Sequence, residues 1–75
     1  MQVKIFNLSI FLNGDFYKFQ SYKIFTLDDL RIFFNYKKKL IIIEYNSKII
    51  PSKNWARVFL KNKDQIEILT IVGGG

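Results

Sequence analysis

The stretch QIEILTIVGGG, residues 65–75, decides the fold that we expect, because it joins a β-type apolar run directly to three glycines. Glycine has no Cβ, so residues 73–75 would form a thin and flexible tail. Three extended residues reach roughly 10 Å beyond the last strand residue. Chain ends are often small and frayed. No polar spacer separates the strand from these glycines, however, so we expect a functional tail.

The alternation of side chains along this strand predicts which of them face solvent. If Glu67 faces outward, Leu69 and Ile71 lie on the same exposed side. Glu44 places Ile42 outward in the same way. An exposed patch of Ile42, Leu69 and Ile71 would be a candidate docking surface for a partner beside the tail. The alternative is a second small core, covered by the N-terminal segment.

The first third of the chain predicts a β-hairpin. Asn13 and Gly14 form the dipeptide preferred by a type I′ turn, which needs positive φ at both central residues. The returning strand is expected at residues 16–19. In the strand before the turn, Asn7 and Ser9 interrupt the apolar positions and predict an irregularity.

A helix is predicted next. Thr26 is a good N-cap, and Asp28 and Asp29 in the first turn suit the positive end of a helix. These two carboxylates are therefore expected to be structural. Lysines 37–39 would follow at the C-terminus, where positive charge is favourable, although a nucleic-acid patch is the alternative. One face of the helix would carry Leu27, Leu30, Phe33 and Phe34.

The remaining chain predicts three further strands. A buried strand is expected at residues 40–45, followed by a turn and a short strand that Pro51 ends. A short helical segment would then present Trp55, as a core plug near Pro51 or, alternatively, as a partner contact. The order strand, strand, helix, strand, strand, strand predicts an α+β fold. We expect a single domain over residues 1–72, with residues 73–75 as the tail.

Composition narrows the possible functions. The 75 residues contain no Cys and no His, which removes disulfides, thiolate metal sites and the usual general base. This argues against an autonomous enzyme and leaves a substrate or carrier protein open. The net charge of +6 permits nucleic-acid binding. Ten of the twelve basic residues are Lys, however, and phosphate recognition usually relies on Arg, so we do not expect nucleic acid as the partner.

No membrane span or targeting signal is expected. The longest apolar run, residues 40–43, is too short to cross a bilayer, and the first twelve residues lack the cleavage site of a signal peptide. Abundant Ile, Lys, Phe, Asn and Tyr suggest an AT-rich gene. We therefore expect a cytoplasmic protein, or a plastid stromal one if the gene is organellar. The base composition of the gene would test this hypothesis.

The second half of the chain resembles the ThiS family of sulfur carriers. The resemblance lies in EYNSKIIP at residues 44–51, WA at 55–56, DQIEILT at 64–70 and VGGG at 72–75. It implies a ubiquitin-like β-grasp fold, a mixed sheet of four to five strands packed on one main helix. Ser47 and Lys63 stand where the family usually has glycine. Asn46 and Asn62 are expected to take up the positive φ there, since Asn tolerates it.

The resemblance also implies a mechanism in thiamine (thiazole) biosynthesis. The carboxylate of Gly75 would be adenylated by a ThiF-type adenylyltransferase and converted to a thiocarboxylate. The sulfur would come from a donor such as a cysteine desulfurase and pass to a ThiG-type thiazole synthase. Gly73 and Gly74 would thread the terminus into these active sites. The chain has no P-loop motif, so the partner would bind the ATP, and we expect no cofactor on this chain.

Three alternatives stay open. The small subunit of molybdopterin synthase resembles this family and also ends in two glycines, but an aromatic and proline-containing approach to the glycines is expected there. A basic β-grasp domain that binds RNA would make the tail incidental. A protein-conjugating modifier shares the activation chemistry, and the sequence does not separate it from a sulfur carrier.

Overall fold

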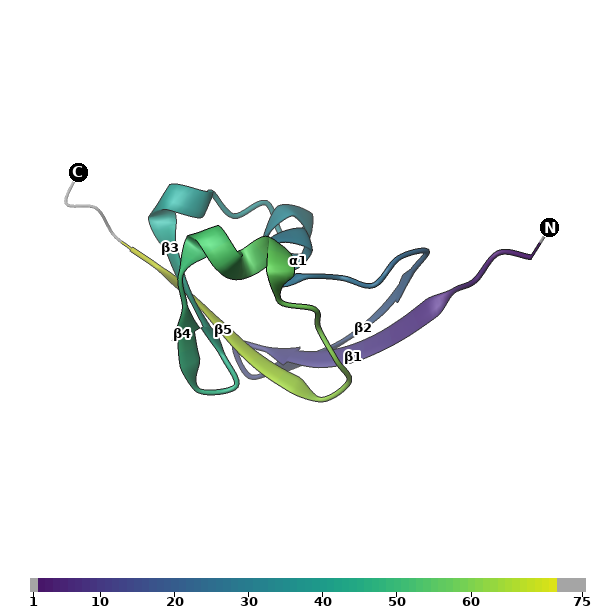
Figure 1. The fold of residues 1–75 in the computed structure, drawn as a ribbon. Coiled ribbons are helices and arrows are strands. Elements are labelled where there is room, and N and C mark those ends of the chain that lie inside the picture. Colours follow the sequence, from purple (N-terminus) through teal and green to yellow (C-terminus); the bar gives the residue numbers. More distant parts are fainter. Residues whose placement is uncertain (1, 72–75) are drawn as a thin grey trace.

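One mixed sheet and one main helix make up the part of the chain that the computed structural model describes, residues 2–71 (Figure 1). The sheet has five strands in the order β2-β1-β5-β3-β4. The predicted α+β architecture and element order are confirmed. Along the chain the elements are β1 (Phe6–Leu12), β2 (Asp15–Ser21), α1 (Leu27–Phe33), η1 (Lys38–Leu40), β3 (Ile41–Tyr45), β4 (Lys48–Ile50), η2 (Ser52–Arg57) and β5 (Asp64–Thr70), where η marks a 3₁₀ helix.

The first two strands form the predicted hairpin. Asn13 and Gly14 have φ of 50° and 85°, as a type I′ turn requires. The expected irregularity in β1 is wrong, because the strand is continuous from Phe6 to Leu12. Asn7 is exposed and its side chain accepts a hydrogen bond from Gln20 across the hairpin (3.2 Å), so a polar residue is accommodated without a break.

The parallel pairing of β1 with β5 is short, and a side chain extends it. The backbone register covers only Ile10 to Leu12 against Asp64 to Ile66. Beyond it, the side-chain amide of Asn13 accepts from Ile68 N (2.8 Å) and donates to Ile68 O (3.3 Å). Asn13 therefore satisfies backbone groups of β5 that β1 is too short to reach.

Helix α1 begins as predicted but ends earlier. Thr26 and Asp29 form a reciprocal capping box. At the other end, Asn35 has φ of 61°, and Tyr36 N donates to Arg31 O (3.0 Å) in a Schellman-type closure. The predicted role of lysines 37–39 at this terminus is therefore wrong, and Lys38 lies in η1.

Two turns hold non-glycine residues at positive φ. Ser47 has φ of 74° and Lys63 has φ of 72°. Asn46 shares the first turn with φ of 47°. The prediction that Asn62 would take up the strain in the second turn is wrong, because Lys63 takes it directly. Asn62 instead accepts a hydrogen bond from Ser9 N (2.8 Å).

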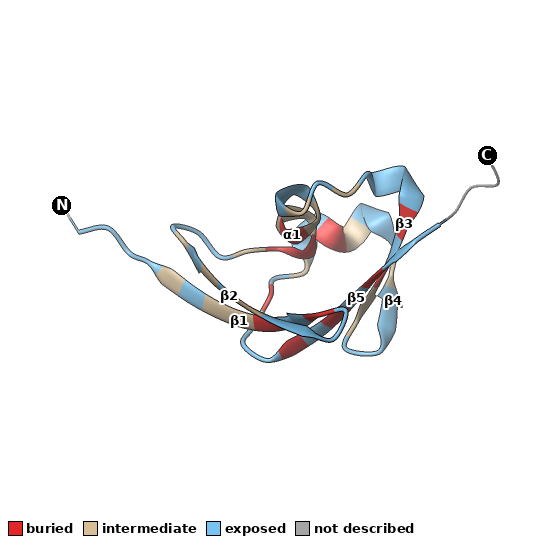
Figure 2. Cartoon of the chain, turned by 180° about the vertical axis from the view of Figure 1, so that it is seen from behind, coloured by how far each residue is buried: buried red, intermediate tan, exposed pale blue. Residues whose placement is uncertain are grey.

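The core lies between the sheet and the layer of α1 and η2, and Figure 2 shows the buried residues along the facing strands and helices. Trp55 is 2% exposed and its indole N–H donates to Ile50 O (2.8 Å), so the core-plug interpretation is confirmed. Phe33 was expected on the buried face of α1 but is 60% exposed. The buried hydrophobic set is Ile10, Leu12, Leu27, Leu30, Ile41, Ile43, Trp55, Leu60, Ile66 and Ile68.

The two ends of the described chain lie at opposite ends of the sheet (Figure 1). Residues 2–5 extend from β1 away from the end where β5 finishes. The N-terminal segment therefore does not cover the outer face of β3 and β5, and the alternative of a second core there is wrong. No helix among residues 2–71 is long and apolar enough to span a membrane.

Candidate functional site

The site is built around the end of β5, from which the glycine tail continues. Strand β5 lies between β1 and β3. Its first three residues pair with β1, and its last residues pair with β3. Thr70 lies opposite Ile41, and Ile71 N donates to Leu40 O (2.6 Å) one step further. The chain is therefore held by hydrogen bonds up to Ile71. Gly73, Gly74 and Gly75 lie outside the described residues.

Three apolar side chains are exposed beside this end. Leu69 is 52% exposed, Ile71 45% and Ile42 36%. Ile42 and Leu69 are direct partners across β3 and β5, so their side chains are neighbours on the outer face of the sheet. Single exposed apolar residues are common on any protein. A cluster beside a candidate reactive terminus is more informative, and its role as a docking surface stays a prediction.

An acidic pair lies next to this patch. Glu44 and Glu67 are direct partners across β3 and β5, one outward-facing position further from the tail than Ile42 and Leu69. Like charges placed opposite each other destabilise a sheet. Neither carboxylate forms an ion pair with any residue in the described range, although the chain carries a net charge of +6. A basic group on a partner would relieve this repulsion. The sequence placed both residues outward, but only the strand register brings them together.

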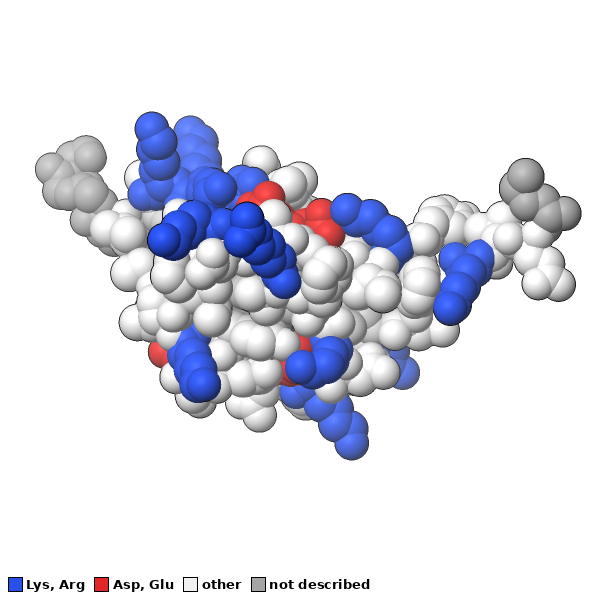
Figure 3. All heavy atoms as spheres, viewed as in Figure 1, with Lys and Arg blue, Asp and Glu red and all other residues white. Residues whose placement is uncertain are grey.

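The positive charge gathers elsewhere. Figure 3 shows Lys and Arg side chains concentrated over the 3₁₀ segments η1 and η2, with few acidic groups among them. Segment η1 contains Lys38 and Lys39, and it runs directly into β3. Arg57 ends η2. By contrast, the outward pairs across β3 and β5 named above are one apolar pair and one acidic pair.

A buried polar network fixes the start of β5, and sequence reasoning missed it. Asp64 is 5% exposed and accepts hydrogen bonds from Tyr45 Oη (2.7 Å), Asn46 Nδ2 (3.1 Å) and Lys61 N (2.7 Å). Burial, together with the hydrogen bond to Asp64, raises the pKa of Tyr45 to about 12. An aspartate at the first position of a strand gives no signal of such contacts in sequence. The network is structural, because it lies at the opposite end of β5 from the tail.

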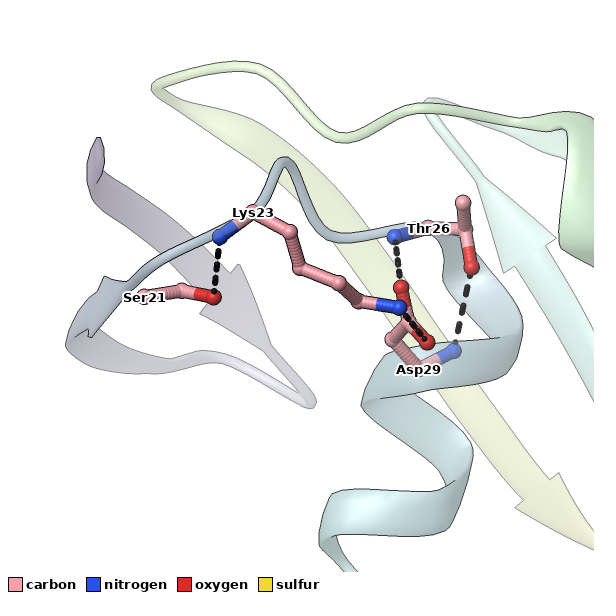
Figure 4. Close-up of polar contacts among 4 residues, drawn as sticks. All are labelled: Ser21, Lys23, Thr26 and Asp29. Carbon is pink, nitrogen blue, oxygen red and sulfur yellow. Dashed lines mark hydrogen bonds and ion pairs between the residues drawn. The ribbon is translucent and has the colours of Figure 1, made fainter. Parts of the chain in front are cut away.

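Asp28 and Asp29 have structural roles, as expected. Asp28 pairs with Arg31 (2.8 Å), and Asp29 belongs to the capping box (Figure 4). Partial burial would raise the pKa of Asp29, but hydrogen bonds from Thr26 and Lys23 outweigh it and lower that pKa. Within residues 2–71, no group of three His, Cys, Asp or Glu side chains could hold a metal ion.

The fold and the site define a class, a small mixed-sheet domain whose central strand leads into a glycine tail. Comparison with known proteins is specific about the family. The ThiS family model matches residues 10–75, which include the tail. The chain therefore belongs to the ThiS family.

Individual relatives agree with this assignment. The chain is 38% identical over 50 residues to the sulfur carrier protein ThiS of Bacillus subtilis (strain 168), which covers 67% of this chain and 76% of that protein. It is 40% identical over 67 residues to the uncharacterized protein ycf40 of Trieres chinensis, covering 89% of each chain. It is 33% identical over 69 residues to the ycf40 protein of Porphyra purpurea, covering 92% and 94%.

A solved structure confirms the fold. The thiamine biosynthesis protein ThiS from Geobacter metallireducens superposes with a TM-score of 0.77 at 17% identity, covering 91% of this chain and all of that one. The predicted ubiquitin-like β-grasp fold is thus confirmed, with five strands in the sheet.

Proposed function

We propose that this protein is a sulfur carrier, with the carboxylate of Gly75 as the group that carries the sulfur. The observation that supports this most strongly is the family match over residues 10–75, which extends through the glycines. The protein would be a substrate of partner enzymes rather than an enzyme. The absence of Cys and His from the sequence agrees with this role, because the sulfur would be carried on the backbone terminus.

The chemistry follows from the properties of a carboxylate. An α-carboxyl group has a reference pKa of about 3.3–3.7 and is an anion at neutral pH, so it resists sulfur nucleophiles. One of its oxygens would attack the α-phosphorus of ATP and release pyrophosphate, giving an acyl-adenylate. A hydrosulfide would then attack the carbonyl carbon, and AMP would leave with the electrons of the C–O bond. The product is a thiocarboxylate on Gly75.

Three partners are proposed for these steps. A ThiF-type adenylyltransferase would bind the ATP and activate Gly75. A donor such as a cysteine desulfurase would supply the sulfur, and a ThiG-type thiazole synthase would accept it. Gly73 and Gly74 would thread the terminus into two different active sites, since a Cβ there would widen the tail.

The patch of Ile42, Leu69 and Ile71 would dock on the activating enzyme. It lies at the end of β5, from which residues 72–75 continue, so a partner that encloses these residues must also approach this surface. The adjacent Glu44 and Glu67 favour a partner surface with a basic side chain next to an apolar one.

Thiamine is the pathway that we favour, with the small subunit of molybdopterin synthase as the alternative. Residues 70–72, TIV, lack the aromatic and proline residues expected before the glycines of that subunit. The compartment, cytoplasm or plastid stroma, stays a prediction. No membrane or nucleic acid is proposed as a partner.

The test is the intact mass of the protein after incubation with a ThiF-type enzyme, ATP and inorganic sulfide. We expect a mass gain equal to one oxygen-to-sulfur exchange, located at Gly75 by fragmentation. Supplying the product to thiazole synthase or to the large subunit of molybdopterin synthase then separates the two pathways. If partner enzymes that modify a known carrier give neither the exchange nor an acyl-adenylate, the proposal is wrong, and salt-sensitive RNA binding becomes the next function to measure.

A further inference from the structure

A hollow of about 300 Å³ opens on the described surface at the open end of the β1–β2 hairpin, away from the end of β5. This volume is at the lower end of the range found for ligand sites. Its lining is mainly apolar and comes from the hairpin, from the loop before α1 and from the segment before β5. The apolar members are Phe6, Leu8, Phe19, Ile24, Phe25 and Leu60.

Part of the hairpin wall precedes the residues that the family model matches. Phe6, Asn7 and Leu8 precede residue 10, where the match to the ThiS family begins. In this region β1 pairs only with β2, because its pairing with β5 starts at Ile10. The hollow therefore depends on a segment outside the matched sulfur-carrier domain.

The opposite wall is held in place by hydrogen bonds (Figure 4). Ser21 Oγ accepts from Lys23 N (3.1 Å), and Lys23 Nζ pairs with Asp29 (3.0 Å) at the start of α1. Phe25 O accepts from Leu60 N (2.8 Å), which ties the loop to the segment before β5. A preformed wall reduces the ordering cost of binding a partner.

One edge of the hairpin offers free backbone groups beside the hollow. Ser9 N–H donates to Asn62 Oδ1 and Ser9 C=O accepts from Lys63 N, so Ser9 turns its backbone away from β2. Backbone groups two residues apart in a strand point the same way. The backbone N–H and C=O of Asn7 therefore also point away from β2, as those of Ser9 do. No described residue forms a hydrogen bond with these two groups, because the pairing of β1 with β5 begins only at Ile10.

Positive side chains line this site, and one of them, Lys23, is already paired with Asp29. Lys23 and Lys61 line the hollow, and none of its described lining residues is acidic. Lys4 lies at the same end, with Nζ 5.0 Å from the ring centre of Phe6. Lys61 forms no ion pair within residues 2–71. An anionic partner would therefore be attracted.

We propose that this groove binds an extended segment of a partner protein that is rich in acidic and apolar residues. The free edge at Asn7 would pair with the backbone of that segment as an added strand. Its apolar side chains would contact Phe6 and Leu8, and its carboxylates would lie near Lys61 and Lys4. The groove and the end of β5 lie at opposite ends of the sheet, so this interaction is separate from the sulfur chemistry proposed above.

The test is selection from a phage-displayed library of random heptapeptides, with the intact protein as target. We expect the enriched peptides to be acidic and apolar and to bind more weakly as salt is raised. The Phe6→Ser variant should lose about tenfold or more in affinity, as for a buried interface aromatic. Its control is Phe16→Ser, on the same hairpin but away from the groove, which should bind normally.

Charge is tested with Lys61→Glu against Lys48→Glu, an exposed lysine on β4. Each substitution lowers the formal net charge from +6 to +4, so a difference in peptide binding between the two variants must come from the position of the substituted lysine. We expect the first to weaken peptide binding and the second to leave it unchanged. Melting temperatures confirm that all variants fold. Any one of four results would overturn the proposal. The selection could enrich no peptides, or peptides without an acidic bias. The Phe6→Ser variant could bind the peptides as well as the wild type does, or the wild type could prove to be a dimer that Phe6→Ser dissociates.

Discussion

Removing the hydroxyl of Tyr45 should destabilise the protein through Asp64. In the Tyr45→Phe variant, the buried Asp64 carboxylate loses its 2.7 Å hydrogen bond but keeps those from Asn46 and Lys61. A hydrogen bond to a charged group contributes about 1.5–3 kcal/mol. Tyr45 is only half-buried, so water can partly replace the lost hydroxyl, and we expect the free energy of unfolding to fall by about 1.5 kcal/mol. For a domain of this size the melting temperature would fall by about 6–12 °C.

The same variant changes the response to alkaline pH. The pKa of Tyr45 is raised from 10.0 to about 12, so the folded state favours the protonated phenol. The contribution of this group to stability is therefore fully present below pH 10 and is lost as the pH rises toward 12. We expect the wild type to lose stability in this interval more steeply than Tyr45→Phe.

The assay is urea unfolding followed by circular dichroism from pH 7 to 11.5. Tyr22→Phe is the matched control, because Tyr22 is 76% exposed and its hydroxyl forms no hydrogen bond in the described structure. That variant should keep wild-type stability at pH 7. The reasoning is refuted if Tyr45→Phe unfolds at the same urea concentration as the wild type, or if the two lose stability equally between pH 10 and 11.5.

Three further substitutions test the turns, the tail and the patch. Lys63→Gly should stabilise the protein by about 0.5–1 kcal/mol in urea unfolding, because the relief of positive-φ strain exceeds the cost of the added entropy of the unfolded chain. The control Lys48→Gly, which places glycine in strand β4, should destabilise the protein. Gly74→Val should abolish thiocarboxylate formation by intact mass without changing the circular dichroism spectrum, and normal conversion would rule out threading. Leu69→Lys should raise the KM of the activating enzyme about tenfold with unchanged folding, whereas Phe59→Lys, equally exposed but elsewhere, should not.

Most of the fold could be predicted because its strongest signals are local. The hairpin at Asn13 and Gly14 and the N-cap at Thr26 depend on residues close in sequence, and both are confirmed. The end of α1 was missed because Asn35 closes the helix, while the lysines that suggested its C-terminus lie further along. Phe33 was misplaced for the same reason, since the helix ends at that residue and its side chain is largely exposed.

The contacts that escaped prediction join residues distant in sequence. Asn13 bonds to Ile68 across 55 positions, and Tyr45 to Asp64 across 19. The register that places Glu44 opposite Glu67 is equally non-local. A single sequence indicates which side chains face outward, but it does not specify which of them meet.

These non-local contacts bear on how a carrier of this kind would work. Strand β5 is fixed at its start by Asp64, along its length by Asn13 and at its end by the bond from Ile71 to Leu40. A terminus that must enter two active sites requires a narrow tail, but it also requires a defined point from which the tail departs. If β5 shifted by one residue, Leu69 would turn inward and Ile68 outward. The hydrogen bonds that fix the register of β5 therefore also keep the candidate docking patch exposed at the end of this strand.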